Sequence, residues 1–174
     1  AIEFYKECLS SEIKPIIGVD FYVALRTRFD KEARIDNQRT RLVLLAENLT
    51  GYHNLLKLVS ASFIDGFYYK PRLDKELIEK HKEGLIAILP SFVKNNADEL
   101  ALYYQETFGP DNFYIEITHH PEINEHEERM KERVNFAKSK NIALCAAHDV
   151  YYLSKEDRPA RNTILSIQGH MFGQ

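Results

Sequence analysis

Carboxylates, imidazoles and a hydroxyl stand at or near the ends of the apolar runs that favour β-strands. In folds of alternating strands and helices, functional groups gather at the carboxyl ends of strands, where several side chains can converge on one ion. Carboxylates and imidazoles are ligands for divalent cations. The spacing contains no compact motif such as His-Glu-x-x-His, so polar strand ends that meet solvent are the alternative. The candidates are Asp20, Glu47, Ser91, His119, His120, His148 and Asp149.

The segment "THHPEINEHEE" (118–128) holds three histidines and four glutamates and could bind a metal on its own. The competing interpretation is that its glutamates begin a helix, because acidic side chains are favourable at a helix N-terminus. His119 and His120 alternate across a predicted strand, so at most one of them faces a shared pocket.

Two segments could contact nucleic acid. In "GFYYKPRLD" (66–74), two tyrosines accompany Lys70 and Arg72, and aromatic and basic side chains together can stack on bases and bind phosphate. The alternative is a partly buried turn with snorkelling cations. The loop 26–41 has six basic and three acidic residues and could touch phosphates, although a solvated or docking loop is the alternative.

The overall composition restricts the class of protein. The chain has 174 residues, of which 44% are hydrophobic, and this is enough for one domain with a core. Its formal net charge of −3 gives no global attraction to nucleic acid or to a membrane surface. The apolar runs are too short to span a bilayer, and the two cysteines lie far apart in sequence. We therefore expect a cytoplasmic protein with reduced thiols.

Hydrophobic periodicity predicts alternating strands and helices, which is typical of a mainly parallel α/β domain. A helix after residue 48 is expected to be capped by Thr50. Its predicted buried face comprises Tyr52, Leu55, Leu56, Val59 and Phe63. The predicted strands are 13–25, 42–48, 85–92, 112–120 and 142–153, and the predicted helices include 74–84, 97–109, 124–141 and 156–168.

Several segments resemble one family. They are "AIEFYKEC", "IKPIIGVDFYVA", "LVLLAEN", "GYHNLLKLVS", "GFYYKPRLDKELIEKH" and "HDVYYLSKEDRPARNTILSIQ". Together they are similar to the polymerase and histidinol phosphatase (PHP) domain of the bacterial DNA polymerase III alpha subunit. The resemblance implies a distorted seven-stranded α/β barrel, here incomplete at its N-terminal end. It assigns 1–168 to a partial PHP domain and leaves 169–174, "GHMFGQ", as a tail of uncertain origin.

The metal motifs of the family are degenerate in this sequence. Its first two histidine motifs would precede residue 1, and its cysteine-containing turn is replaced by "PSF". Asp20 stands where metal-binding members usually carry glutamate, Arg41 replaces a histidine, and Tyr151 replaces the histidine that follows Asp149. The resemblance leaves Asp20, His120 and Asp149 as remnant ligands, too few to hold a zinc or manganese cluster tightly.

The resemblance implies a non-catalytic domain that scaffolds a replicative polymerase. Its expected partners are the remaining polymerase domains, the proofreading exonuclease subunit and, through the parent polymerase, DNA; no membrane is expected. No cofactor is expected, with zinc, manganese or magnesium bound only if the site functions. The alternative is a metal-dependent phosphoesterase or 3′–5′ exonuclease, and a third hypothesis is a DNA-binding module. Loss of the first strands should expose a sheet edge and favour association.

Overall fold

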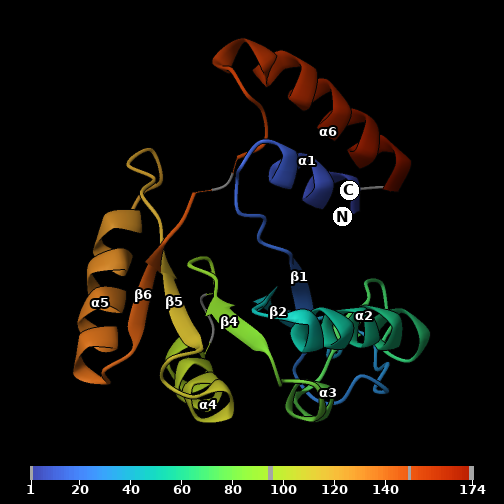
Figure 1. Cartoon of the computed structure of the whole chain (residues 1–174), viewed down its shortest axis with the longest axis vertical. Coiled ribbons are helices and arrows are strands. Elements are labelled where there is room, and N and C mark those ends of the chain that lie inside the picture. The colour runs from blue at the N-terminus through green and yellow to red at the C-terminus, as the bar shows by residue number, and fades with distance from the viewer. Residues whose placement is uncertain (1, 94–95, 149, 173–174) are drawn as a thin grey trace.

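A six-stranded mixed β-sheet forms the frame of the protein (Figure 1). The computed structural model describes residues 2–93, 96–148 and 150–172, with side chains as far as residue 167. The strand order is β3-β1-β2-β4-β5-β6, and β2 runs antiparallel to both of its neighbours while the other pairs are parallel. The strands are β1 (Gly18–Ala24), β2 (Arg39–Ala46), β3 (Arg72–Leu73), β4 (Leu85–Leu89), β5 (Phe113–Ile117) and β6 (Ala143–Ala146). The predicted α/β class is thereby confirmed.

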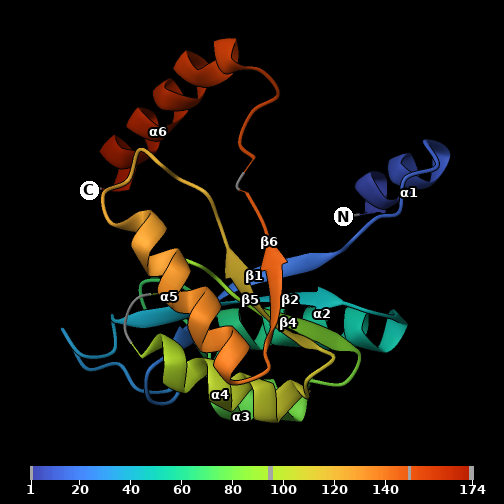
Figure 2. The ribbon, with the colours of Figure 1, turned by 90° about the vertical axis from the view of Figure 1, so that its left-hand side faces the viewer.

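The helices divide into those that cover the sheet and those that stand apart from it. Figures 1 and 2 show α2 to α5 along the sheet, whereas α1 and α6 lie beyond the end at which β6 finishes. The helices are α1 (Ile2–Ser10), α2 (Leu49–Ile64), α3 (Lys75–Lys80), α4 (Ala97–Phe108), α5 (His126–Ser139) and α6 (Arg158–Phe172), with a 3₁₀ turn η1 (Lys155–Asp157).

The hydrophobic core follows from alternation along the strands. In β4 the buried positions are Leu85, Ala87 and Leu89, with partly exposed residues between them. Leu42 and Leu44 of β2 are fully buried on the same principle. They join one continuous cluster with residues of α2, α4 and β5. Each fully buried leucine contributes about 1.5–3 kcal/mol relative to an exposed one.

Helix α2 differs from its prediction in cap and in rotation. Asn48, rather than Thr50, is the N-cap, and its Oδ1 accepts a hydrogen bond of 3.0 Å from the Gly51 amide. Leu56 and Phe63 are exposed, which corrects the predicted buried face. The reason is a close backbone approach: a Cβ on Gly51 would lie 1.8 Å from the Gly84 carbonyl oxygen. The helix therefore turns its glycine toward the start of β4. The buried residues are Gly51, Asn54, Leu55, Leu58 and Ser62.

The last strand is shorter than predicted. Strand β6 ends at Ala146, because β5, its partner in the described sheet, ends at Ile117 in register with it. One further bond, from the Ala147 amide to the Ile117 carbonyl, closes the ladder. The described residues that follow, 147–148 and 150–153, are exposed, so the predicted strand 142–153 is correct only at 143–146.

A buried guanidinium holds the loop between β1 and β2. Arg72 is fully buried, and its three nitrogens donate hydrogen bonds of 2.7–3.1 Å to four backbone carbonyls. Beside it, the guanidinium of Arg28 contacts both oxygens of the buried Asp74 carboxylate at 2.9 and 3.0 Å. The loop is therefore tied to β3 by charged side chains rather than by an apolar core. The four acceptors belong to Arg28, Asp30, Asp36 and Gly66.

We predict that Arg72→Met lowers the free energy of unfolding by at least about 3 kcal/mol, because it leaves several buried carbonyls without a donor. Urea denaturation measures this change. Lys70→Met is the matched control: Lys70 is exposed two residues away, and its loss should cost less than about 0.5 kcal/mol. Equal effects of the two substitutions would contradict the role of Arg72.

Candidate functional site

Asp20 is paired with an arginine on the neighbouring strand. It is the third residue of β1 and lies diagonal to Arg41 of β2, since Asp20 is opposite Val43 and Tyr22 is opposite Arg41. Arg41 Nε donates to Asp20 Oδ1 at 3.1 Å, and its terminal nitrogen donates to Oδ2. Both carboxylate oxygens are thus engaged by one guanidinium, a bidentate geometry that is stronger than a single contact.

This pairing does not fit a metal ligand. A guanidinium has no lone pair to offer a metal, and its fixed positive charge repels a divalent cation beside it. Arg41, at the position that the family resemblance assigns to a histidine ligand, therefore places its own positive charge beside the Asp20 carboxylate. Within the described ranges, no three histidine, cysteine, aspartate or glutamate side chains converge to hold an ion.

A second polar group lies where β4 and β5 end. The Ser91 amide donates to Glu116 Oε1 at 2.9 Å, and Thr118 Oγ1 donates to Ser91 Oγ at 3.0 Å. His126, the first residue of α5, places Nε2 at 3.1 Å from the Thr118 carbonyl oxygen. These bonds connect the ends of two parallel strands with the start of the helix.

His120 extends this group. Its Nδ1 lies 3.1 Å from Glu122 Oε1, and its ring stacks on that of His148 with centroids 5.0 Å apart. The His126 ring stands edge-on to it, with centroids at 5.2 Å. Hydrogen bonds from its own backbone and from His120 hold the pKa of Glu122 below its usual range. A carboxylate that stays ionised is a strong acceptor for the imidazole N–H.

The structure brings together only part of the predicted set. Ser91, His120 and His148 belong to the group just described, and His119 is exposed beside it. Glu47 lies at the opposite end of the sheet, because β2 is antiparallel and the Glu47 amide bonds to Gly84, the residue before β4. Asp149 lies outside the described residues.

His126 lies in the segment 118–128 that was considered as a possible metal site, but it was not named there as an individual candidate. It is 2% exposed and lies on the buried face of α5 with Met130 and Ala137. The helical spacing of the sequence indicates this burial, since positions 126, 130 and 137 lie on one face of a helix. A histidine at the start of a buried stripe could have been recognised as part of the interior.

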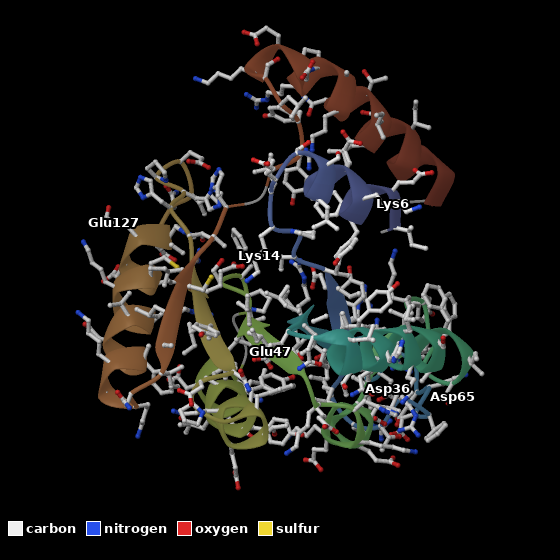
Figure 3. The ribbon with its side chains drawn as sticks, in the orientation of Figure 1. Lys6, Lys14, Asp36, Glu47, Asp65 and Glu127 are labelled. Atoms are coloured by element: carbon white, nitrogen blue, oxygen red, sulfur yellow. The ribbon has the colours of Figure 1, made fainter. Side chains whose placement is uncertain are left out.

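The glutamates near His126 belong to the first turn of α5 or precede it, and two of them stabilise the helix. Glu127, labelled in Figure 3, pairs with Lys131 one turn later at 2.9 Å. Glu127 and Glu128 lie in the first turn, where acidic residues favour the helix dipole. Glu125 occupies the N-cap position with φ of 62° and makes no side-chain cap hydrogen bond, so the capping prediction fails for this residue.

The two predicted phosphate contacts, Lys70 and Arg72, differ in accessibility. Arg72 is fully buried and bonded to backbone carbonyls, which leaves no exposed guanidinium for a phosphate. Lys70 is exposed. The neighbouring Tyr68 and Tyr69 pack against each other edge to face, with centroids at 4.7 Å. The segment 66–74 therefore fits the alternative of a partly buried turn. Of Lys70 and Arg72, only Lys70 is accessible to a phosphate.

An apolar groove of about 990 Å³ lies beside α1. Its walls include Tyr5 and Leu9 of α1 and Leu49 and Tyr52 of α2. Figure 3 labels Lys6, Lys14 and Glu47, which lie along this side of the molecule. None of the nine residues of α1 is buried, so the helix presents its apolar side chains to solvent.

No helix in the described part of the chain has both the length and the apolar character required to cross a membrane.

Comparison with known proteins identifies the relatives of this chain. The PHP domain family model matches residues 1–120. The chain is 38% identical to the DNA polymerase III alpha subunit of Borreliella burgdorferi and 37% identical to that of Thermus aquaticus, over 96% and 97% of its length. The alpha subunit of Treponema pallidum is 38% identical over 96% of the chain. The chain spans about 15% of the length of these relatives.

We predict that the Asp20–Arg41 pair is a modest ion pair that divalent cations do not disrupt. A double-mutant cycle with Asp20→Asn and Arg41→Gln should give a coupling of about 0.2–1 kcal/mol, because both side chains are partly exposed. Urea unfolding with and without millimolar Mn²⁺ provides the measurement, and the Glu127→Gln, Lys131→Gln cycle is the exposed reference pair. Loss of the coupling in Mn²⁺ alone would show that the carboxylate prefers the metal.

Proposed function

Because the chain belongs to the PHP domain family, we propose that it acts as the non-catalytic PHP domain of a replicative DNA polymerase alpha subunit. In this role it is a structural scaffold for the polymerase core and a docking surface for the proofreading exonuclease, in the cytoplasm. DNA is contacted through the parent polymerase rather than by a basic face of this domain.

The engagement of Asp20 by Arg41 is the observation that carries the non-catalytic part of the proposal. Hydrolysis by a metal-activated water requires a cation held by several ligands next to an open coordination position. Here the carboxylate at one family position accepts both guanidinium hydrogen bonds. Tyr151, at another such position, supplies a phenol in place of an imidazole, and neutral phenol is a poor metal ligand.

The scaffold part of the proposal rests on exposed apolar surface. Ile2, Tyr5 and Leu9 recur along α1 and are 47–67% exposed at the groove. The relatives are far longer than this chain, which supports a partner surface within the same polymerase. We assign the groove beside α1 to the polymerase core, because apolar surface of this size is stable when another domain covers it.

The sheet also has two free edges in the described structure. Strand β3 forms one edge with two residues, and β6 forms the other with Ala143 and Ala146 exposed. The seven-stranded barrel of the family would cover these edges with further strands. This supports the expectation that the isolated chain associates with itself, since open strand edges are templates for pairing.

We predict that the chain has no metal-dependent nuclease activity. Single-stranded DNA labelled at its 5′ end, incubated with the chain and Mn²⁺, Zn²⁺ or Mg²⁺, should be shortened no faster than in the presence of a chelator. His120→Ala is the matched control for a contaminating nuclease. Metal-dependent shortening that disappears in His120→Ala would instead establish the phosphoesterase or exonuclease alternative.

We predict that Leu9→Asp weakens association of the chain with the polymerase core, supplied as a separate polypeptide, by at least tenfold. The substitution places a charge in an apolar contact and leaves the core intact, because Leu9 is 54% exposed. Isothermal titration calorimetry measures the affinity, and the fully exposed Leu153→Asp is the control outside the groove. The same titration with the exonuclease subunit tests its docking. Absence of both interactions would contradict the scaffold proposal.

A further inference from the structure

Helix α2 carries a second row of apolar side chains, on a face other than the one that its buried residues occupy. The row repeats at alternating intervals of three and four residues. Its first, third and fifth members are 49–68% exposed, and the two between them are half-buried. We call this row the α2 seam, and it consists of Leu49, Tyr52, Leu56, Val59 and Phe63.

The charge content of α2 is low for a helix on the outside of a sheet. Lys57 is the only charged residue among its sixteen, whereas half of the fourteen residues of α5 are charged. A surface helix normally presents charged and polar side chains on the face opposite its core. Because α2 presents the seam instead, we expect another element to cover this face.

The spacing of the seam favours a helix as the covering element. Apolar residues at alternating intervals of three and four form the row into which the side chains of a second helix insert. From Leu49 to Phe63 the seam is about 21 Å long at the helical rise of 1.5 Å per residue. A β-strand gains most of its binding from free backbone groups of its partner, and the side of a helix offers none.

The seam is continuous with two other apolar features. Leu49 and Tyr52 also line the groove beside α1, which we assigned to the polymerase core. At the other end, Phe63 stacks with Phe67 of the following turn, with ring centroids 6.5 Å apart. Phe67 is 49% exposed. One partner element can therefore run from the groove along α2 to this aromatic pair.

We propose that the α2 seam binds one amphipathic α-helix of the polymerase core. The inference rests on the proposed scaffold role and deepens it by naming the partner element. That helix has its own apolar row at intervals of three and four residues, over about four turns. Because the one charge on α2 is positive, an acidic flank suits the partner better than a basic one. The relatives have ample further sequence for it, since this chain spans about 15% of their length.

Photo-crosslinking in the full-length polymerase chain tests the proposal. Leu56 and Phe63, one heptad apart, are each replaced by a benzophenone amino acid, and both should form adducts with one segment outside this domain. On a helix the two sets of adducts lie about seven residues apart, whereas on a strand, which rises about 3.3 Å per residue, they lie about three apart. A probe at Thr50, exposed on the side of α2 away from the seam, is the control and should not label that segment.

Cysteine labelling gives a second readout. Leu56→Cys should react with a maleimide at least about tenfold more slowly in the full-length chain than in the isolated chain, because a covering helix excludes water. Thr50→Cys should react equally fast in both. Both positions are exposed, so neither substitution disturbs the core. The native Cys8 and Cys145 are half-buried, and peptide mass spectrometry separates their labels from the new one.

Three results would overturn the proposal. Adducts about three residues apart would indicate an extended partner. Adducts with a second molecule would indicate that another copy of the chain covers the seam. Equal labelling of Leu56→Cys in the two chains would leave the seam open to solvent. After any of these results the scaffold role can still stand, because Leu9→Asp tests it at the groove. Failure of both tests would remove the scaffold role as well.

Discussion

The buried guanidinium of Arg72 is the constraint on which the β1–β2 half of the protein depends. Removing a cation from water is costly, and this cost is offset here by hydrogen bonds to four carbonyls rather than by a single carboxylate. Those carbonyls come from both ends of the loop between β1 and β2 and from the turn before β3. The register in which Asp20 and Arg41 meet is therefore supported from outside the hairpin.

The Asp20–Arg41 contact gives a carboxylate a positive partner without a metal ion. A carboxylate in a metal site is stabilised by the cation that it binds. A guanidinium on the adjacent strand provides a positive charge at the same place, without an open coordination position and without a bound water to activate. The strand pairing is retained, since the arginine also fits the exposed face of the sheet.

The histidine group at the end of β5 has a different physical origin. It arises from the turn that carries the chain from β5 into α5, where Pro121 follows the strand and the helix begins at His126. The turn folds His126 back onto Thr118, eight residues earlier. The result is a set of aromatic and imidazole rings in which His120 Nε2 and His126 Nδ1 are buried without a hydrogen-bond partner in the described part of the chain.

Much of the architecture was determined by local sequence. The apolar runs predicted β1, β2, β4 and β5. The positions of the functional side chains required the tertiary structure. Glu47 lies at the opposite end of the sheet from Ser91 and His120, because β2 is antiparallel to its neighbours. Strand direction is set by long-range pairing rather than by periodicity.

Arg72 and His126 show the same limit. Both are polar residue types that composition places at the surface, and both are buried by partners distant in the chain or across a turn. The acceptors of Arg72 lie 6 to 44 residues away. Sequence alone thus determined most of the segments that become strands. Only the folded chain decided which polar groups are buried, because that depends on acceptors that local pattern does not reveal.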